Sequence, residues 1–153
     1  MLTRLRNRLR ELTPAEFRRM EAEAVTVTAQ LAEDFQDNVR RSLQTIDVLM
    51  AHPAYADPQW RRQLFMLSHD MRGLGGSFNY QLITVICDSL CALLREEELA
   101  TERLRQRYLA AHVAALQAIL QFDLKGDGGD QGQRLLATIR LPEAAPGPQQ
   151  EVP

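Results

Sequence analysis

The sequence predicts an all-α protein: an antiparallel four-helix bundle with an N-terminal helical extension and a short C-terminal helix. Apolar residues recur every three or four positions over four long stretches, which is the period of an amphipathic helix. No stretch of useful length alternates with the two-residue period of a strand. Short connections separate the four stretches, and short connections favour antiparallel neighbours.

The first helix is predicted to begin at Pro14. Thr13 can act as the N-cap, Pro14 occupies the first helical position and Glu16 the third, so the three form a capping box. The β-branched run at residues 25–28 (VTVT) has low helix propensity, so we expect a kink or a short break there. The helix should end before Pro53. Its inward stripe is predicted to be Leu31, Phe35, Val39, Leu43, Ile46 and Met50.

Three further helices are expected over residues 58–77, 80–95 and 100–122. Glycines in Lys125–Gly132 (KGDGGDQG) should break the last helix, and residues 133–140 should form a short extra one. The predicted helical domain therefore spans residues 14–140. A basic extension over residues 1–13 precedes this domain. A proline-rich tail, predicted to be disordered, follows the domain over residues 141–153. The leucines and arginines of that extension fit a solvated helix, or docking to a partner or an anionic surface.

Composition narrows the function classes. The 153 residues fit one domain, the net charge of −2 gives no nucleic-acid signature, and no apolar run is long enough to span a membrane. There is no secretory signal, and Cys87 and Cys91 lie four apart on one predicted helix. We therefore interpret the two cysteines as reduced thiols of a cytoplasmic protein, and the pair alone does not predict a metal site. The protein is expected to be a monomer and not to insert into a membrane.

The second predicted helix carries one histidine, His69, on its exposed face. The predicted core stripe is Leu64, Leu67, Met71, Leu74 and Phe78, which leaves His69 on the opposite face. Gly73 and Gly76 lie one and two turns after His69 on its own side, where a bare backbone would let a large partner approach. Gly75 is expected to point toward the core and allow close helix packing. His112 falls on the inward stripe of the fourth helix and is interpreted as a satisfied core-edge histidine.

These residues resemble the histidine-containing phosphotransfer (HPt) family, the helical modules of two-component phosphorelay signal transduction. The family pattern of histidine, then lysine or arginine three positions later, then glycine and small residues, fits His69, Arg72, Gly73, Gly76 and Phe78. The resemblance continues at residues 86–90 (ICDSL) and more loosely over residues 15–140. Asn79 and Tyr80 depart from the family pattern, as does Cys91, which replaces a polar side chain that helps orient the histidine in some members.

The resemblance implies a phosphocarrier, a phosphoprotein with a phosphohistidine intermediate at His69, rather than an enzyme with an ATP site. Arg72 would stabilise phosphate charge, and Phe65, Gly73 and Gly76 would contact the partner. The implied partners are response-regulator receiver domains and a hybrid histidine kinase. No cofactor and no metal are expected on this chain, because the receiver domain supplies the Mg²⁺.

Two alternatives stay open at this stage. A helical bundle of this kind could bind receivers or a kinase without relaying phosphate. The two cysteines could instead make a metal- or redox-responsive bundle.

Overall fold

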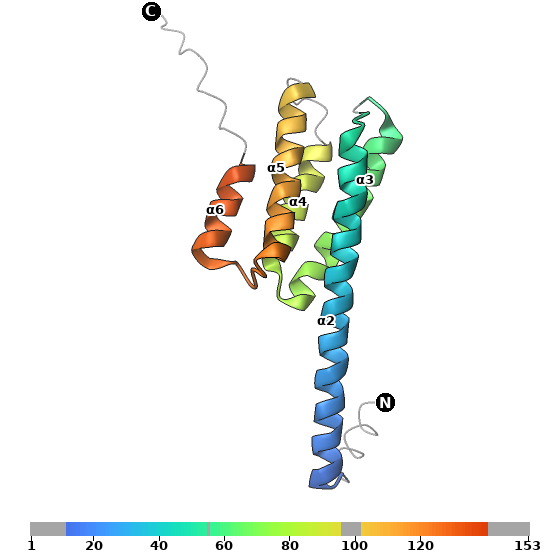
Figure 1. The fold of residues 1–153 in the computed structure, drawn as a ribbon, viewed down its shortest axis with the longest axis vertical. Helices are drawn as coiled ribbons and strands as arrows, with labels where there is room; N and C mark the ends of the chain where they lie inside the picture. Colours follow the sequence, from blue (N-terminus) through green and yellow to red (C-terminus); the bar gives the residue numbers. More distant parts are fainter. Residues whose placement is uncertain (1–11, 55, 96–101, 141–153) are drawn as a thin grey trace, which may run out of the picture. The chain divides into compact units, whose positions relative to one another are not determined.

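The protein is all-α. The computed structural model (Figure 1) describes residues 12–54, 56–95 and 102–140, with the side chains of residues 102–104 excepted. These residues contain five α-helices, one short 3₁₀ helix and no strand, which confirms the predicted class. The helices are α2 (Pro14–Ala51), α3 (Pro58–Gly75), the 3₁₀ helix η1 (Gly76–Phe78), α4 (Gln81–Arg95), α5 (Glu102–Gln121) and α6 (Gly129–Ile139).

The chain divides into two compact units, residues 1–37 and residues 38–153, with the boundary inside α2. The predicted basic extension over residues 1–13 lies outside the described residues apart from its last two positions, and the predicted tail over residues 141–153 lies outside them entirely. Within the described ranges, no helix is both long and apolar enough to cross a membrane.

The first unit contains the beginning of α2. The capping box is confirmed: the Thr13 backbone N–H donates to Glu16 Oε2 at 2.8 Å, and the Glu16 N–H donates to Thr13 Oγ1 at 3.3 Å. The expected kink at residues 25–28 is wrong, because α2 runs without a break to Ala51. The hydroxyls of Thr26 and Thr28 donate to carbonyls one turn earlier, so both polar groups are satisfied inside the helix.

In the second unit, α4 contacts α3 on one side and α5 on the other, and α6 contacts both α5 and α4. The part of α2 from residue 38 onward belongs to this unit, and among its polar contacts are one with α3 and one with α5. The Trp60 indole donates to the carbonyl of Leu49 at 3.0 Å, and the Gln117 amide donates to the Asp47 carboxylate at 3.1 Å. The predicted third and fourth helices agree with α4 and α5 to within two residues at each end.

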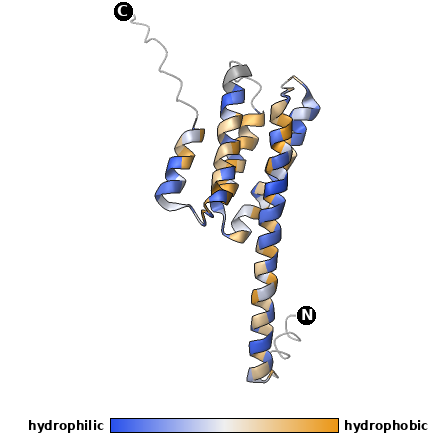
Figure 2. Cartoon of the chain, viewed as in Figure 1, coloured by the Kyte–Doolittle hydropathy of each residue, from blue (hydrophilic) through white to orange (hydrophobic). Residues whose placement is uncertain are grey.

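The helix α4 supplies the largest share of the core, and its colouring in Figure 2 is accordingly hydrophobic over much of its length. Burial of these side chains removes a large apolar area from water and is the main favourable term in folding. The buried residues of α4 are Leu82, Ile83, Ile86, Cys87, Leu90, Cys91, Leu93 and Leu94.

The predicted core stripe of α3 is partly wrong. Leu64 and Met71 are buried, but Leu74 is 44% exposed, and Leu67 and Phe78 are only half-buried. The error has a physical reason: the buried face also uses the small residues Ser68 and Gly75, which a stripe drawn through large apolar residues misses. The buried residues of α3 are Trp60, Leu64, Ser68, Met71 and Gly75.

At Gly75 the backbone of α3 packs directly against Thr84 of α4 and against Tyr80. A Cβ at this position would lie 2.6 Å from Thr84 Oγ1 and 2.9 Å from the carbonyl oxygen of Tyr80. The Tyr80 N–H donates to the Gly75 carbonyl at 2.8 Å, so the backbone ends of the two helices are tied together. The expected role of Gly75 in close helix packing is confirmed, and α3 ends there rather than at residue 77, with η1 continuing the turn.

Residues just after α5 hold this junction in place. Tyr80 is fully buried, and its hydroxyl donates to the Asp123 carboxylate, while Lys125 Nζ lies 3.8 Å from the centre of the Tyr80 ring. The Gly126 N–H donates to the Asn79 carbonyl at 2.7 Å. Asn79 itself adopts the left-handed conformation with φ 61°, which asparagine tolerates better than most residues.

Only the first part of the glycine-rich segment after α5 is non-helical, because its last four residues already belong to α6. α6 begins at Gly129, earlier than the predicted residue 133, because Gly128 takes a left-handed conformation (φ 70°) immediately before it. The Asp127 carboxylate accepts a hydrogen bond from the Gly129 N–H at 2.9 Å. An aspartate at this place compensates an N–H group that the first turn leaves unpaired.

Substitution of Gly75 by alanine should destabilise the protein, because the new methyl group overlaps backbone as well as the Thr84 side chain. We expect a loss of about 1–3 kcal/mol in the free energy of unfolding, typical of overpacking. Urea denaturation followed by circular dichroism measures it. Gly73→Ala is the matched control: it meets no atom within 4 Å and should be neutral or stabilise by up to about 1 kcal/mol. Equal stability of the two variants would contradict the close packing.

Candidate functional site

His69 lies on the outer face of α3, with 52% of its side chain exposed. The neighbouring residue Ser68 is completely buried, and its hydroxyl donates to the Leu64 carbonyl at 2.8 Å. Burial of Ser68 directs the side chain of His69 toward solvent. Its Nδ1 atom is 3.8 Å from Asp70 Oδ1, and among the described residues nothing hydrogen-bonds to Nε2. A neutral imidazole with a free nitrogen is a competent nucleophile.

The surface beyond His69 is open. A Cβ built on Gly73 or on Gly76 would meet no atom within 4 Å. Gly76 has an ordinary helical conformation with φ −64° and ψ −33°, so neither packing nor backbone strain requires a glycine there. Both glycines are exposed, on the side of the helix that the spacing predicted, whereas Gly75 between them is buried. The absence of a side chain at positions 73 and 76 therefore leaves space above the helix and does not serve the core.

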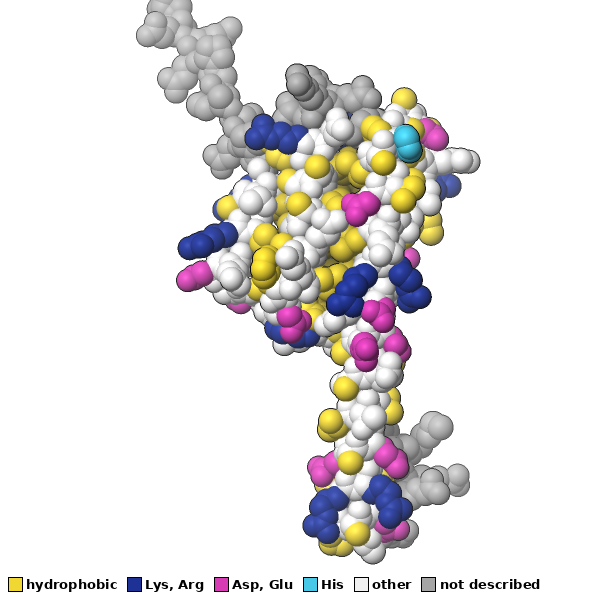
Figure 3. Space-filling view, in the orientation of Figure 1, with side chains coloured by type: hydrophobic (Ala, Val, Ile, Leu, Met, Phe, Trp, Pro, Cys, Tyr) yellow, Lys and Arg dark blue, Asp and Glu magenta, His cyan; other side chains and the backbone are white. Residues whose placement is uncertain are grey.

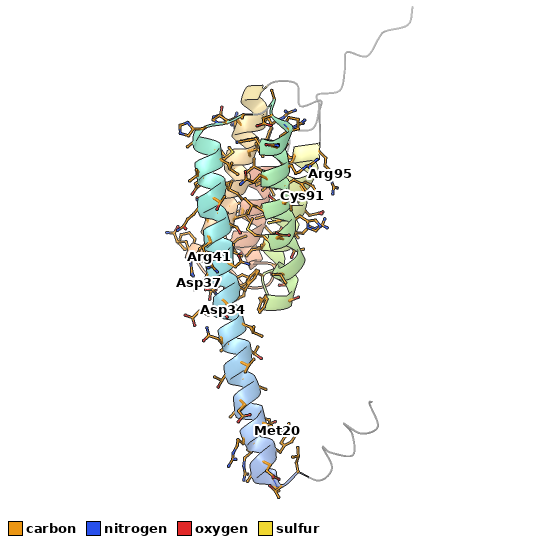
Figure 4. The ribbon with its side chains drawn as sticks, turned by 90° about the vertical axis from the view of Figure 1, so that its right-hand side faces the viewer. Met20, Asp34, Asp37, Arg41, Cys91 and Arg95 are labelled. Carbon is orange, nitrogen blue, oxygen red and sulfur yellow. The ribbon has the colours of Figure 1, made fainter. Side chains whose placement is uncertain are left out.

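Phe65 and Arg95 extend the site toward α4. The ring centres of Phe65 and His69 are 6.0 Å apart with 27° between their planes, and the Arg95 guanidinium carbon lies 4.8 Å from the Phe65 ring centre. Figure 4 labels Arg95 one turn beyond Cys91 on α4. A cation over an aromatic face is attracted by its quadrupole. The three side chains form a row from α4 to α3 that ends at the imidazole.

Arg72 is tied to α4 by its side chain and by its backbone. Its Nη1 atom is 2.8 Å from Asp88 Oδ1, and its carbonyl accepts a hydrogen bond from Thr84 Oγ1 at 3.1 Å. The ion pair is open to water, and such pairs contribute at most about 1 kcal/mol. One guanidinium nitrogen is therefore occupied by Asp88, while the remaining donors stay available for a second anion.

A shallow cavity of about 390 Å³ lies beside Phe65, between α3 and α4. No ion pair joins its arginines to an acidic side chain within the described ranges, and the Nε of Arg61 is buried without a hydrogen-bond partner. This surface is consequently basic and suits an acidic partner. The lining residues are Pro58, Arg61, Arg62, Phe65, Leu94 and Arg95.

All five site residues predicted from the sequence (Phe65, His69, Arg72, Gly73 and Gly76) lie on α3 or at the start of η1. The sequence did not identify Asp88 or Arg95, because their contacts depend on how α4 packs against α3. It also placed Leu74 in the core, whereas Leu74 and Met66 are exposed apolar residues of α3.

No protein-family model, no curated protein and no solved structure matches this chain.

The buried histidine, His112, is satisfied, as expected. His112 is buried, with its Nε2 atom 2.9 Å from Ser89 Oγ and its Nδ1 atom 2.6 Å from the Tyr108 carbonyl. Burial lowers the pKa of His112, while the hydrogen bond to Tyr108 opposes this shift. The neutral ring bridges α4 and α5 as a structural element.

The two cysteines are free thiols in the core. Burial raises the pKa of Cys87 to about 12, and it also raises the pKa of Cys91. A thiol that stays protonated near neutral pH is a poor nucleophile. Among the described residues, no three His, Cys, Asp or Glu side chains are grouped closely enough to hold a metal ion. These facts give no support to the metal- or redox-responsive alternative.

Stability should fall as the pH drops below about 6.5, in part because of His112. An unfolded histidine takes up a proton near that pH, while the buried ring of the folded protein resists it, so acid favours the unfolded state. Urea unfolding at pH 7.5 and at pH 5.5 should show a smaller loss of unfolding free energy in His112→Gln than in the wild type. An NMR titration of the His112 ring with a midpoint above 6.5 would contradict this assignment.

Proposed function

We propose that the chain is a phosphocarrier of a multistep phosphorelay. His69 accepts a phosphoryl group from the aspartyl phosphate of one receiver domain and passes it to the aspartate of another. The proposal rests on the HPt-like pattern around His69. The observation that carries it is the exposed imidazole on α3 with unoccupied space above Gly73 and Gly76.

In the accepting step, His69 Nε2 attacks the phosphorus of the aspartyl phosphate. The new N–P bond forms as the P–O bond to the donor aspartate breaks, and the donor leaves as a carboxylate. The second step is the reverse reaction with another receiver. No nucleotide is consumed, and the Mg²⁺ needed to offset phosphoryl charge belongs to the receiver. The chain contributes an aligned nucleophile and a nearby cation.

Arg72 would supply that cation. It is one helical turn from His69, and a planar guanidinium can donate two hydrogen bonds to phosphoryl oxygens. Because the pair with Asp88 is exposed and weak, Asp88 can hold Arg72 in place before transfer and share it with the phosphoryl group afterwards.

The proposed function also implies a particular arrangement of the helices and a cellular context. α2 to α5 would form the antiparallel four-helix bundle of an HPt domain, with α6 as the additional helix. The protein would act in the cytoplasm with receivers and a hybrid histidine kinase. The basic cavity beside Phe65 would face acidic surface on these partners.

The rival function is binding without transfer. The exposed residues Met66 and Leu74 and the basic cavity would serve equally well in a module that only occupies receivers. The two functions differ in whether His69 becomes covalently modified.

A transfer assay distinguishes them. Receiver domains labelled with ³²P by a hybrid kinase are freed of ATP and mixed with the chain. We expect acid-labile, base-stable label on the wild type and none on His69→Gln, while the melting temperature changes little because the side chain is exposed. Asp70→Asn, beside it and also exposed, is the control and should keep most of the label. Receiver binding without any label would favour the rival, and full labelling of His69→Gln would overturn the proposal.

Glutamine at Gly73 or Gly76 should separate docking from stability. The helix should become as stable or more stable, since glutamine is the better helix former by about 1 kcal/mol. Transfer from the receiver should nevertheless fall at least about tenfold, because the new side chain fills the open space above His69. Ala114→Gln on the exposed face of α5 is the control. Unchanged transfer rates in both glycine variants would show that this surface is not the approach to His69.

A further inference from the structure

The imidazole of His69 has no hydrogen bond that would fix its ring. Its Nδ1 atom lies 3.8 Å from Asp70 Oδ1, which is too long for a hydrogen bond, and both side chains are exposed. Among the described residues, no other group hydrogen-bonds to either ring nitrogen. An exposed side chain without such a contact changes rotamer within picoseconds to nanoseconds. A nucleophile that must meet a phosphorus atom held by a docked partner therefore needs another kind of support.

Phe65 supports the ring from the preceding turn of α3. The centres of the two rings are 6.0 Å apart and their planes are inclined by 27°, which is within the range of attractive aromatic pairs. Phe65 is half-buried and lines the cavity between α3 and α4 beside Leu94. The preceding residue, Leu64, is buried in the core and anchors this turn of the helix. The phenyl ring therefore limits the rotation of the imidazole on one side.

Arg95 holds the phenyl ring from α4. Its guanidinium carbon lies 4.8 Å from the centre of the Phe65 ring, a distance at which the face of an aromatic ring attracts a cation. Arg95 is the last residue of α4, and Leu94 before it is buried, so the base of the side chain is anchored in the core. Figure 4 labels Arg95 at this end of the helix, beyond Cys91. The imidazole is thus connected through Phe65 to a second helix.

No ion pair to a described residue draws Arg95 away from the aromatic ring. In the second unit, Figure 3 shows basic side chains beside acidic ones at several places. Arg72, for example, is paired with Asp88. Within the part of the chain that the structure describes, no acidic side chain pairs with Arg95, and its guanidinium contacts the Phe65 ring. The cation is therefore available to hold the phenyl ring.

We propose that Phe65 and Arg95 are positioning residues, which hold the His69 ring ready for attack on a docked phosphoryl donor. The inference rests on the proposed function and changes the role of Phe65, which the sequence assigned to partner contact. Arg95 acts on the phenyl ring, and the phenyl ring acts on the imidazole. The bonds formed and broken are unchanged: Nε2 gains the phosphoryl group and the donor aspartate leaves as a carboxylate. A nucleophile held near its attack geometry reacts faster, because less orientational freedom is lost in the transition state.

Transfer from a ³²P-labelled receiver measures this support. At saturating receiver, the single-turnover rate should fall at least about fivefold in Arg95→Gln and in Phe65→Leu. Arg95→Lys and Phe65→Tyr keep the cation and the ring, so both should recover most of the rate. Arg62→Gln is the matched control: Arg62 is exposed and lines the same cavity, but it has no aromatic contact among the described residues. Both glutamine variants should weaken docking by a similar factor, whereas only Arg95→Gln should lower the saturated rate.

Phosphoramidate, a small phosphoryl donor, distinguishes positioning from a change in the nucleophile itself. Its P–N bond breaks as His69 Nε2 forms the new N–P bond, ammonia leaves, and the Nδ1 proton goes to the solvent. This donor can approach a freely turning ring from many directions, so its rate in Arg95→Gln should stay within about twofold of the wild type. An equal loss with phosphoramidate and with the receiver would overturn the positioning role.

NMR of the unphosphorylated protein tests the contacts without any transfer. The wild type should show nuclear Overhauser effects between the ring protons of His69 and Phe65, and Arg95→Gln should weaken them. Equal intensities in the two proteins would show that Arg95 does not hold the phenyl ring and would contradict the proposal. That result is expected if Arg95 pairs in solution with the glutamates that follow it in the sequence, at positions 96–98.

Failure of the positioning role and failure of the proposed function give different results. A wild type that takes label from phosphoramidate but from no receiver would overturn both. Receiver transfer at the wild-type rate in Arg95→Gln would overturn the positioning role alone. The melting temperature of each variant shows whether the fold is retained, which we expect because Arg95 is exposed and Phe65 is only half-buried.

Discussion

The contact of Gly75 with the start of α4 determines the geometry of the candidate site. A side chain at position 75 would overlap Thr84 and the backbone of Tyr80, so α3 can lie this close to α4 only with glycine there. Once residue 75 faces α4, the helical period turns Met71, Ser68 and Leu64 inward. His69 and the glycines on its side must then face outward. The exposure of the imidazole is thus a consequence of how the opposite face of α3, from Leu64 to Gly75, packs.

The same junction is supported from the far end of the second unit. Tyr80 is buried and linked to Asp123 and Lys125 after α5, and Asn79 shares a backbone hydrogen bond with Gly126. Asn79 and Tyr80 are two of the three positions at which the sequence departs from the HPt-like pattern. The departure has a structural use, since the tyrosine anchors the end of η1 to the loop between α5 and α6. Loosening of that loop would therefore alter the position of η1, which lies next to the open surface beside His69.

The two halves of α2 use different apolar periods. From Phe35 to Ile46 the buried residues are spaced by four, four and three, and they belong to the core. From Phe17 to Leu31 the spacing averages 3.5 residues and the side chains are exposed. A period of 3.5 keeps a stripe aligned with a single neighbouring helix over several turns, whereas a broader stripe suits a core made by several helices. One continuous helix therefore carries an exposed apolar stretch and a buried one.

The sequence by itself determined the helices, because the apolar period, the Thr13–Glu16 capping box and the prolines act locally. It also identified His69, Gly73 and Gly76 as an exposed group and assigned Gly75 to packing, since one-turn spacing alone places them on two faces. It could not set the rotation of α3, and Leu74 was misplaced because small residues, not large apolar ones, define the face that meets α4. Nor could it find the partners of Arg72 and Phe65. Asp88 and Arg95 are 16 and 30 residues further along the chain, and only the register between α3 and α4 brings them within reach.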